Sequence, residues 1–302
     1  MRFIFSKRVI TTITILVVFL VGIFGFTIYF KSNLFKPVSE IVLPENLDPK
    51  NTLIGKSVKG RAIEAYTYGN GETHIAFVGG IHGGYEWNSV LLAYKFMDYL
   101  SANPEIIPKN ITVTVIPSAN PDGVYKVIGK EGRFTPADVS TGISEAPGRF
   151  NANNVDLNRN FDCKWQATST WQNKLVSAGS APFSEPEAKA IRDFVSKNNP
   201  VAVIFWHSKS NAVYASECKK GILSETLNIM NAYSKASGYQ AIKTFDSYAV
   251  TGDAEGWLAS INIPAITVEL STHETVEWEQ NLAGIKALFE YYEKPVPLEI
   301  GN

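Results

Sequence analysis

The sequence has no excess of positive charge: 28 Lys and Arg residues stand against 29 Asp and Glu, which leaves a formal net charge of −1. Proteins that follow nucleic-acid phosphates carry a basic patch or run. This chain has no long basic run, so its composition argues against nucleic acid as a partner. No internal repeat or low-complexity block is present either. With 302 residues, 45% of them hydrophobic, the chain is long enough to build one large core.

Cysteine and histidine are scarce, with two and four copies. The even cysteine count permits one disulfide, between Cys163 and Cys218, if these residues lie outside the cytoplasm. The sequence does not show whether the two cysteines meet, and two buried free thiols are an equally good interpretation.

One stretch lacks charge altogether. The 22 residues from Val9 to Phe30 contain no charged side chain, and at about 1.5 Å of rise per residue they are long enough for a helix to cross a bilayer. A cleaved signal peptide is the alternative, but the stretch exceeds the usual apolar region of about 7–15 residues and no A-x-A-like site follows it. The nearby basic residues are Arg2, Lys7 and Arg8 before the stretch and Lys31 and Lys36 after it. This modest bias favours an uncleaved, single-pass anchor in the cell membrane, with the amino terminus inside and the catalytic part extracytoplasmic.

These features divide the chain into four parts. Residues 1–8 form a cytoplasmic amino terminus, 9–30 the transmembrane anchor, 31–50 a stalk and 51–302 a single folded domain. The stalk carries three prolines among polar residues and shows no sustained period, which is typical of a connecting segment.

Beyond the stalk, short β-branched runs alternate with helical patterns. The predicted strands are 74–78, 111–116, 201–206 and 266–270, and the predicted helices are 89–100, 185–196 and 276–292. A capping box, with Ser184 as the N-cap and Glu187 at the third helical position, is expected to open the second helix. This alternation favours an α/β fold with a mixed central sheet and helices on both faces.

Chemically informative side chains fall at the ends of the predicted strands, where open α/β sheets place their ligands. His82 and His207 each follow a predicted strand, Glu86 lies four residues after His82, and Glu269 ends another strand. Zinc takes nitrogen from His and oxygen from Glu, and a catalytic zinc keeps a fourth position for water. A His and a Glu in a Gly-rich turn are also ordinary loop residues, but two of only four histidines directly after strands favour a metal site.

Two further motifs lie between these residues. Residues 120–123, Asn-Pro-Asp-Gly, are a turn signal. Residues 156–161, Asp-Leu-Asn-Arg-Asn-Phe, place a guanidinium between two carboxamides, a combination suited to gripping a carboxylate through two parallel hydrogen bonds. The other two histidines, His74 before a strand and His273 in a loop, are interpreted as structural or as supporting the site.

In this order, the motifs H-x-x-x-E, NPDG, DLNRNF, HS and TVEL resemble the zinc metallocarboxypeptidase family, which includes carboxypeptidase A. The resemblance covers about residues 51–292. It implies that His82, Glu86 and His207 bind one zinc ion per chain and that Glu269 is the general acid/base. Because the space between anchor and domain is short, we expect no folded pro-segment and no zymogen control.

The resemblance also implies how substrate is held. Asn158 and Arg159 look like the clamp for the terminal carboxylate of a peptide, and Tyr248 looks like the mobile tyrosine that covers bound substrate. The arginine that stabilises the oxyanion is expected to be Arg149, just before the DLNRNF motif, with Arg133 as the alternative.

The chain departs from the family pattern at two positions. The family has two residues between the first His and the Glu, whereas a Gly-Gly-Tyr triplet separates His82 from Glu86 here. The paired glycines allow the backbone to bulge and return Glu86 to the metal. Ser208 follows the second histidine as in the family, but Lys209 replaces the usual aromatic residue.

The function implied is zinc-dependent removal of the C-terminal residue from a peptide with a free terminal carboxylate. In the family, the residue seven places after the tyrosine lines the base of the pocket for the terminal side chain, and here it is Glu255. A carboxylate there favours basic or diamino-acid ends, such as those of bacterial cell-wall stem peptides, and Asp253 could serve the same purpose. The alternatives are a zinc-dependent N-acyl amino acid deacylase and a non-catalytic pseudoenzyme that binds peptide ends.

Overall fold

The computed structural model describes residues 49–139 and 144–293. The predicted cytoplasmic terminus, the anchor and nearly all of the stalk therefore lie outside the described residues. Within these two ranges, no helix is both long and apolar enough to cross a membrane.

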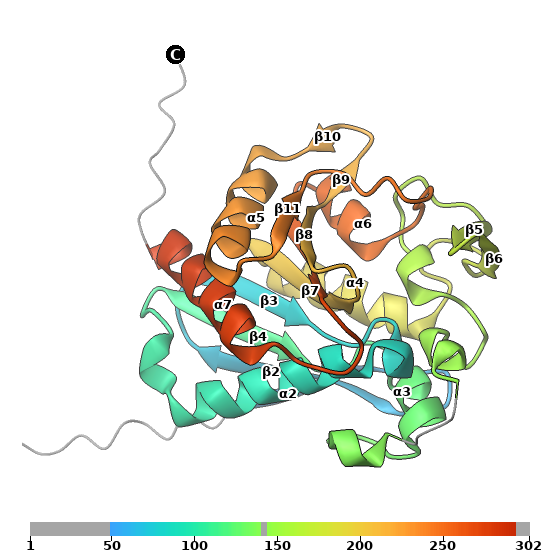
Figure 1. Cartoon of the computed structure of the whole chain (residues 1–302), viewed down its shortest axis with the longest axis horizontal. Coiled ribbons are helices and arrows are strands. Elements are labelled where there is room, and N and C mark those ends of the chain that lie inside the picture. Colours follow the sequence, from blue (N-terminus) through green and yellow to red (C-terminus); the bar gives the residue numbers. More distant parts are fainter. Residues whose placement is uncertain (1–48, 140–143, 294–302) are drawn as a thin grey trace, which may run out of the picture. The chain divides into compact units, whose positions relative to one another are not determined.

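A mixed eight-stranded sheet forms the centre of the folded domain, with the strand order β1-β2-β4-β3-β7-β12-β8-β11 (Figure 1). Its strands are β1 (Lys50–Lys56), β2 (Ala62–Gly69), β3 (Thr73–Val78), β4 (Ile111–Ile116), β7 (Ala202–Ser208), β8 (Ala212–Ala215), β11 (Gln240–Ile242) and β12 (Ala265–Leu270). The central strands β4, β3, β7 and β12 are parallel, and β2 and β8 pair antiparallel on either side of them. The predicted mixed central sheet is confirmed.

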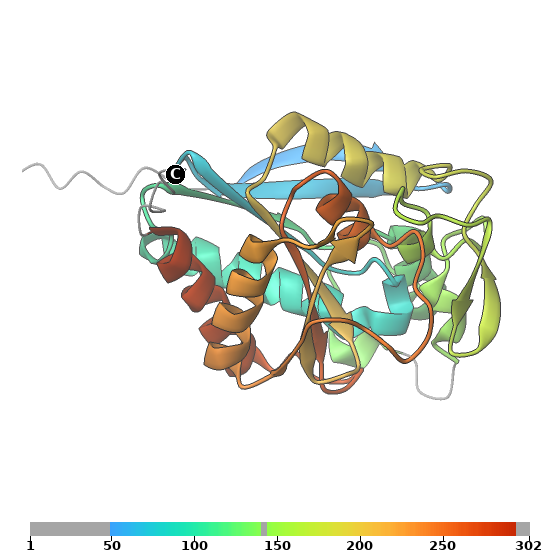
Figure 2. The ribbon, with the colours of Figure 1, turned by 90° about the horizontal axis from the view of Figure 1, so that it is seen from above.

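Helices cover both faces of this sheet. Those of the described residues are α2 (Trp87–Ala102), α3 (Pro121–Ile128), α4 (Pro186–Asn198), α5 (Ser224–Ser237), α6 (Ala254–Ser260) and α7 (Trp278–Glu293). Side chains of a strand alternate between the two faces. Phe77 of β3 accordingly packs on Phe96 of α2, with ring centroids 5.1 Å apart, in the core shared with α5 and α7. Val78 belongs to the opposite core, built with α4 and α6. Figure 2 shows helices on both sides of the sheet.

Every strand and helix that the periodicity predicts is present, with boundaries shifted by at most three residues, but two local interpretations are wrong. The N-cap of α4 is Glu185 rather than Ser184, whose hydroxyl instead donates to Glu185 Oε1 at 2.9 Å. Residues 120–123 do not form an isolated turn. They open α3, because the Gly123 N–H donates to Asn120 Oδ1 at 2.9 Å, with Pro at the first helical position.

The two cysteines form a disulfide. Cys163, in the loop after the DLNRNF motif, bonds to Cys218 on the short strand β9 (Glu217–Cys218), which pairs with β10 (Gly221–Ile222). The two Cα atoms are 6.1 Å apart and separated by 55 residues in sequence. This resolves the choice between a disulfide and free thiols, and it links the loop after the DLNRNF motif to β9.

We expect the disulfide to contribute measurably to stability. Cross-linking a loop of this length restricts the unfolded chain, so a Cys163→Ala/Cys218→Ala variant should lose about 2–4 kcal/mol of unfolding free energy. The measurement is urea unfolding of the variant, with thiol-reduced wild-type protein as the control that keeps both sulfur atoms. A loss below about 0.5 kcal/mol in both samples would contradict the expectation.

Candidate active site

Two of the predicted site residues come from neighbouring parallel strands. Glu269 on β12 is the Cα partner of His207 on β7. Because side chains alternate along a strand, His207 faces the same side as Val203 and Phe205, which pack in the core with α4 and α6. His207 and Glu269 therefore emerge side by side at the carboxyl ends of their strands, on the same face of the sheet.

His82 and Glu86 are brought together by a single tight turn. His82 follows β3, and the 3-10 helix η1 (Gly83–Glu86) starts immediately after it. Gly83 has a φ of +48°, and a Cβ at this position would lie 2.5 Å from the carbonyl oxygen of Gly148. Only glycine fits that conformation and that close backbone approach. The extra residue of the H-x-x-x-E motif is absorbed by this turn, so Glu86 Oε1 lies 2.8 Å from His82 Nδ1.

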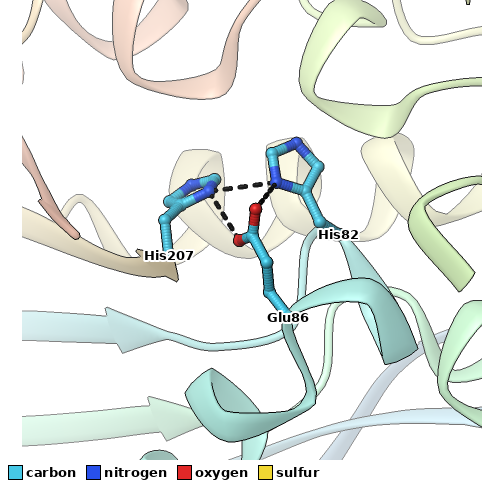
Figure 3. A group of neighbouring side chains, drawn as sticks. All are labelled: His82, Glu86 and His207. Atoms are coloured by element: carbon cyan, nitrogen blue, oxygen red, sulfur yellow. Dashed lines mark hydrogen bonds and ion pairs between the residues drawn. The ribbon is translucent and has the colours of Figure 1, made fainter. Parts of the chain in front are cut away.

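His207 completes a compact cluster with these two residues (Figure 3). Its Nδ1 lies 3.1 Å from Glu86 Oε2 and 3.1 Å from His82 Nδ1. One ligand atom from each of the three residues lies within 4.8 Å of the others, and all three side chains are buried. The cluster could thus hold a metal ion, and its nitrogen and oxygen donors are those that zinc accepts.

Hydrogen bonding supports the same conclusion. Among the described residues, Glu86 Oε2 is a buried oxygen without a hydrogen bond of good geometry, although His207 Nδ1 lies 3.1 Å from it. The Nδ1 atoms of His82 and His207 lie 3.1 Å apart. Without a cation, they could interact favourably only by sharing a proton. A cation between the three side chains would satisfy all of these atoms, so the residues present fit a bound zinc.

Each histidine turns its second nitrogen toward a carboxylate. His82 Nε2 lies 3.6 Å from Asp156 Oδ1, and His207 Nε2 lies 3.1 Å from Glu255 Oε1. Carboxylates in this position fix the orientation of metal-binding imidazoles. Sequence reasoning assigned Asp156 no role, although its place at the start of the DLNRNF motif was the available signal.

The surrounding charges set the protonation of the cluster. Burial and the neighbouring Arg149 lower the pKa of His82 to about 4, which keeps its imidazole neutral, as metal binding requires. Burial opposes ionisation of Glu86, but the two histidines hold the pKa of its carboxyl well below the usual value. For His207, burial is outweighed by Glu86 and Glu255, which raise its pKa.

Arg149 lies beside the cluster and Arg133 does not. Arg149 ends the 3-10 helix η4 (Ala146–Arg149), is 3% exposed, donates from Nε to Asp156 Oδ2 at 2.9 Å and approaches Glu86 Oε1 to 3.8 Å. Its guanidinium lies over the Trp171 ring, 4.7 Å from the centroid. Arg133 is at the surface, paired with Asp98 at 2.8 Å, so it can contribute nothing to this site.

The predicted clamp residues lie on a third short helix, η5 (Leu157–Arg159). The Ala254 N–H donates to Asn158 Oδ1 at 2.8 Å, which fixes that carboxamide. Arg159 donates from its guanidinium to the carbonyl oxygens of Asn158, at 2.6 Å, and of Thr170, at 3.1 Å. Both clamp side chains are mostly buried and line the cavity described next.

A cavity of about 660 Å³ unites these groups. The residues of interest that line it are His82, Glu86, Arg149, Asn158, Arg159, His207, Tyr248, Asp253, Glu255 and Glu269. The hairpin of β5 (Thr168–Trp171) and β6 (Lys174–Ser177) contributes Trp171 to the wall. All nine predicted site residues therefore face one space.

Glu269 has a raised pKa in this cavity. Burial and the nearby Glu86 charge raise the pKa of Glu269 to about 8. A cation held by Glu86 would weaken the second of these causes. A carboxyl group whose pKa lies near neutrality can both accept and return a proton.

Glu255 contacts two other side chains, His207 and Thr267, which the sequence did not indicate. It lines the cavity, but its Oε1 accepts from the Thr267 hydroxyl at 3.1 Å in addition to its contact with His207. Asp253 is the N-cap of α6 and accepts from the Gly256 N–H at 2.7 Å. Burial and the Glu255 charge raise the pKa of Asp253 to about 6.

The two remaining histidines differ in position. His74 Nε2 lies 2.8 Å from the Thr114 hydroxyl and does not line the cavity. His273 does line it, with Nδ1 2.8 Å from the Ser208 hydroxyl and its ring 4.7 Å from that of Tyr85.

Solved structures share this fold. Thrombin activatable fibrinolysis inhibitor superimposes with a TM-score of 0.67 at 20% identity, covering 82% of this chain and 70% of that one. Murein-tripeptide amidase MpaA from Escherichia coli O157 gives a TM-score of 0.57 at 20% identity and covers 83% and 94%. At such identities the likeness concerns the fold alone.

Sequence comparison identifies the family. Gamma-D-glutamyl-L-diamino acid endopeptidase 1 of Lysinibacillus sphaericus is 28% identical over 245 residues. The match spans 74% of this chain but only 61% of that relative, which is less than two thirds of its length. The family model for zinc carboxypeptidases matches residues 50–289, which is most of the chain. The chain thus belongs to the zinc carboxypeptidase family.

Proposed function

We propose that this protein is a zinc-dependent exopeptidase that removes the C-terminal residue of a peptide. One observation carries the proposal: the His82–Glu86–His207 cluster shares a single cavity with Arg149, with Glu269 and with two side chains suited to binding a carboxylate. A metal cluster alone would suit many hydrolases. The clamp of Asn158 and Arg159 beside the cluster favours a peptide whose terminal carboxylate lies at these two side chains.

The chemistry follows from the charges around the cluster. A zinc ion held by His82, Glu86 and His207 would polarise the scissile carbonyl and lower the pKa of a water molecule toward about 7. Glu269 takes the proton of the attacking water and delivers it to the leaving amine. Arg149 faces the developing negative charge on the carbonyl oxygen. It is held in place by Asp156, so little reorganisation is needed.

The clamp determines where the chain is cut. Arg159 and Asn158 bind the terminal carboxylate, and Tyr248, half-buried at the cavity wall, closes over it. An internal peptide bond offers no free carboxylate at this position, so it gains none of this binding energy.

The proposal is tested with peptide libraries incubated with purified, zinc-loaded full-length protein. Mass spectrometry should show loss of single C-terminal residues that a chelator abolishes, and chelator-resistant or internal cleavage would contradict it.

We further propose that the preferred terminal residue is basic or a diamino acid. Glu255 and Asp253 place two carboxyl groups in the cavity wall, and the names of two similar proteins concern a diamino acid and a murein tripeptide. Cell-wall stem peptides are therefore the substrate class we favour. Within the described residues no hydrogen bond engages Glu255 Oε2, which leaves it available to an ammonium group of the substrate.

This preference predicts a ranking of substrates. For matched peptides, kcat/KM should be higher for Lys and Arg ends than for Leu and Phe ends, because an apolar side chain would leave the carboxylate unpaired at about 1–3 kcal/mol, or roughly 5- to 150-fold. Glu255→Gln should reduce the ratio, with zinc content measured as the control since Glu255 contacts His207. Faster cleavage of Leu or Phe ends by the unmodified protein would refute the preference. An unchanged ratio in Glu255→Gln would assign it to Asp253.

The location of the protein is likewise our proposal. We propose that residues 9–30 anchor it in the cell membrane with the catalytic domain extracytoplasmic, where the Cys163–Cys218 disulfide is stable. Protease added to intact cells should then release the domain from the membrane. Recovery of a mature soluble protein that begins after Phe30 would mean that the segment is cleaved.

A further inference from the structure

Two groups of residues in the cavity wall are each held together by hydrogen bonds or ring packing of their own. The clamp wall comprises Asn158, Arg159, Thr251 and Glu255. It is joined by the hydrogen bond from the Ala254 N–H to Asn158 Oδ1 and by that from the Gly252 N–H to the Cys163 carbonyl oxygen at 2.7 Å.

The second group, the acyl wall, comprises Tyr85, Ser208, Lys209 and His273. Its members are joined by the Ser208–His273 contact of 2.8 Å and by the packing of the His273 and Tyr85 rings. The His82–Glu86–His207 cluster connects the two walls. Ser208 and Tyr85 of the acyl wall directly adjoin its members in sequence. Glu255 of the clamp wall lies 3.1 Å from His207 Nε2.

The direction of a bound peptide assigns the acyl wall a role, and this step rests on the proposed function. With the terminal carboxylate on Asn158 and Arg159, the scissile carbonyl lies at the metal cluster. The part of the peptide on the amino-terminal side of this carbonyl must then run away from the clamp wall. Among the lining residues, those of the acyl wall adjoin the metal cluster directly in sequence, at Tyr85 and Ser208, and there we place this part of the substrate.

Lys209 gives the acyl wall a free positive charge. The cationic side chains lining the cavity are Arg149, Arg159, Lys164 and Lys209. Arg149 is paired with Asp156, Arg159 is assigned to the terminal carboxylate, and Lys164 adjoins the clamp wall next to Cys163. Lys209 is exposed and has no ion pair among residues 49–139 and 144–293.

We propose that Lys209 binds a free carboxylate on the residue that supplies the acyl group of the scissile bond. An ordinary α-linked residue with an apolar side chain has no such group. A γ-linked glutamyl residue has one, because linkage through the side chain leaves its α-carboxylate free, and an α-linked glutamyl residue has one in its side chain. The ammonium group thus selects substrates by a charge on the far side of the bond from the clamp.

The test compares two matched substrate pairs on zinc-loaded full-length protein. The first pair is L-alanyl-γ-D-glutamyl-L-lysine and its α-carboxamide analogue, and the second is α-linked Ala-Glu-Lys and Ala-Gln-Lys. In the unmodified protein, kcat/KM should be about fivefold higher for the carboxylate member of at least one pair, a size expected for a solvent-accessible ion pair. This ratio should shrink as salt is raised from about 50 mM to 500 mM.

Three variants identify the residue responsible. Lys209→Ala should bring the ratio close to 1, and Lys209→Glu should invert it, whereas Lys164→Ala, which removes the exposed lysine next to the clamp wall, should leave the ratio as it is. A preference confined to the γ-linked pair would support the proposal and identify the substrate linkage.

A ratio near 1 in the unmodified protein, or one that persists in Lys209→Ala, would overturn the proposal while leaving the exopeptidase function standing. If none of the four peptides or any other were cleaved, the proposed function itself would fail, and this inference with it.

Discussion

Glu269→Gln is expected to keep zinc and the native fold while losing about 10²–10⁴-fold in hydrolysis rate. The carboxylate is placed by β12 next to His207 in the sheet register, in the cavity that contains the metal-binding cluster. The substituted amide has almost the same shape but cannot accept the proton of the attacking water. The defect should therefore lie in kcat rather than in substrate affinity.

The measurement for this variant is kcat on a lysine-ending peptide, together with zinc stoichiometry and the thermal midpoint of unfolding. Glu279→Gln, an exposed substitution on α7, serves as the matched control and should behave as the unmodified protein. Near-normal turnover by Glu269→Gln would show that Glu269 is not the general acid/base.

The second large effect concerns the metal itself. His207→Ala should no longer hold stoichiometric zinc, because within residues 49–139 and 144–293 the cluster has three side-chain donors within 4.8 Å of one another. Loss of an outer carboxylate typically weakens metal binding about 10–100-fold, so removal of a direct ligand should weaken it by more than about 100-fold. Asp156→Asn, which keeps the shape but not the charge beside His82, should fall within the smaller range.

His74→Ala is the matched control for this prediction, because His74 bonds to Thr114 and does not line the cavity. Zinc content after dialysis against a weak chelator measures the effect independently of activity. Full zinc occupancy in His207→Ala would show that the metal, if any, is held elsewhere.

Patterns along the chain were sufficient to predict the part of the site that depends on strand ends. His207 and Glu269 end apolar runs that could only be buried strands, and parallel neighbours place their carboxyl ends together. The same reasoning predicted the mixed sheet and its helices. It failed where one short sequence fits two structures. Asn-Pro-Asp-Gly suits both a turn and the start of a helix. In the structure, Asn120 is the N-cap of α3.

Other features depend on contacts between distant residues, which no local pattern contains. The disulfide joins residues 55 apart, and the contact of Glu255 with His207 crosses from α6 to β7. Whether Glu86 could return to His82 depended on close packing at Gly83, where a side chain would meet the backbone of Gly148. The sequence indicated the glycines, but only the packing explains why they are needed.

The central claim, that a zinc cluster and a carboxylate clamp act together on a chain end, is tested most directly with one pair of peptides. Zinc-loaded full-length protein is incubated with an N-acetylated peptide ending in Lys, either as the free acid or as the C-terminal amide, and the products are identified by mass spectrometry. We predict release of Lys from the free acid and a loss of at least about 100-fold for the amide, since the Arg159 guanidinium and the Asn158 carboxamide then have no carboxylate to bind. Equal cleavage of both peptides, or cleavage at an internal bond, would contradict the account.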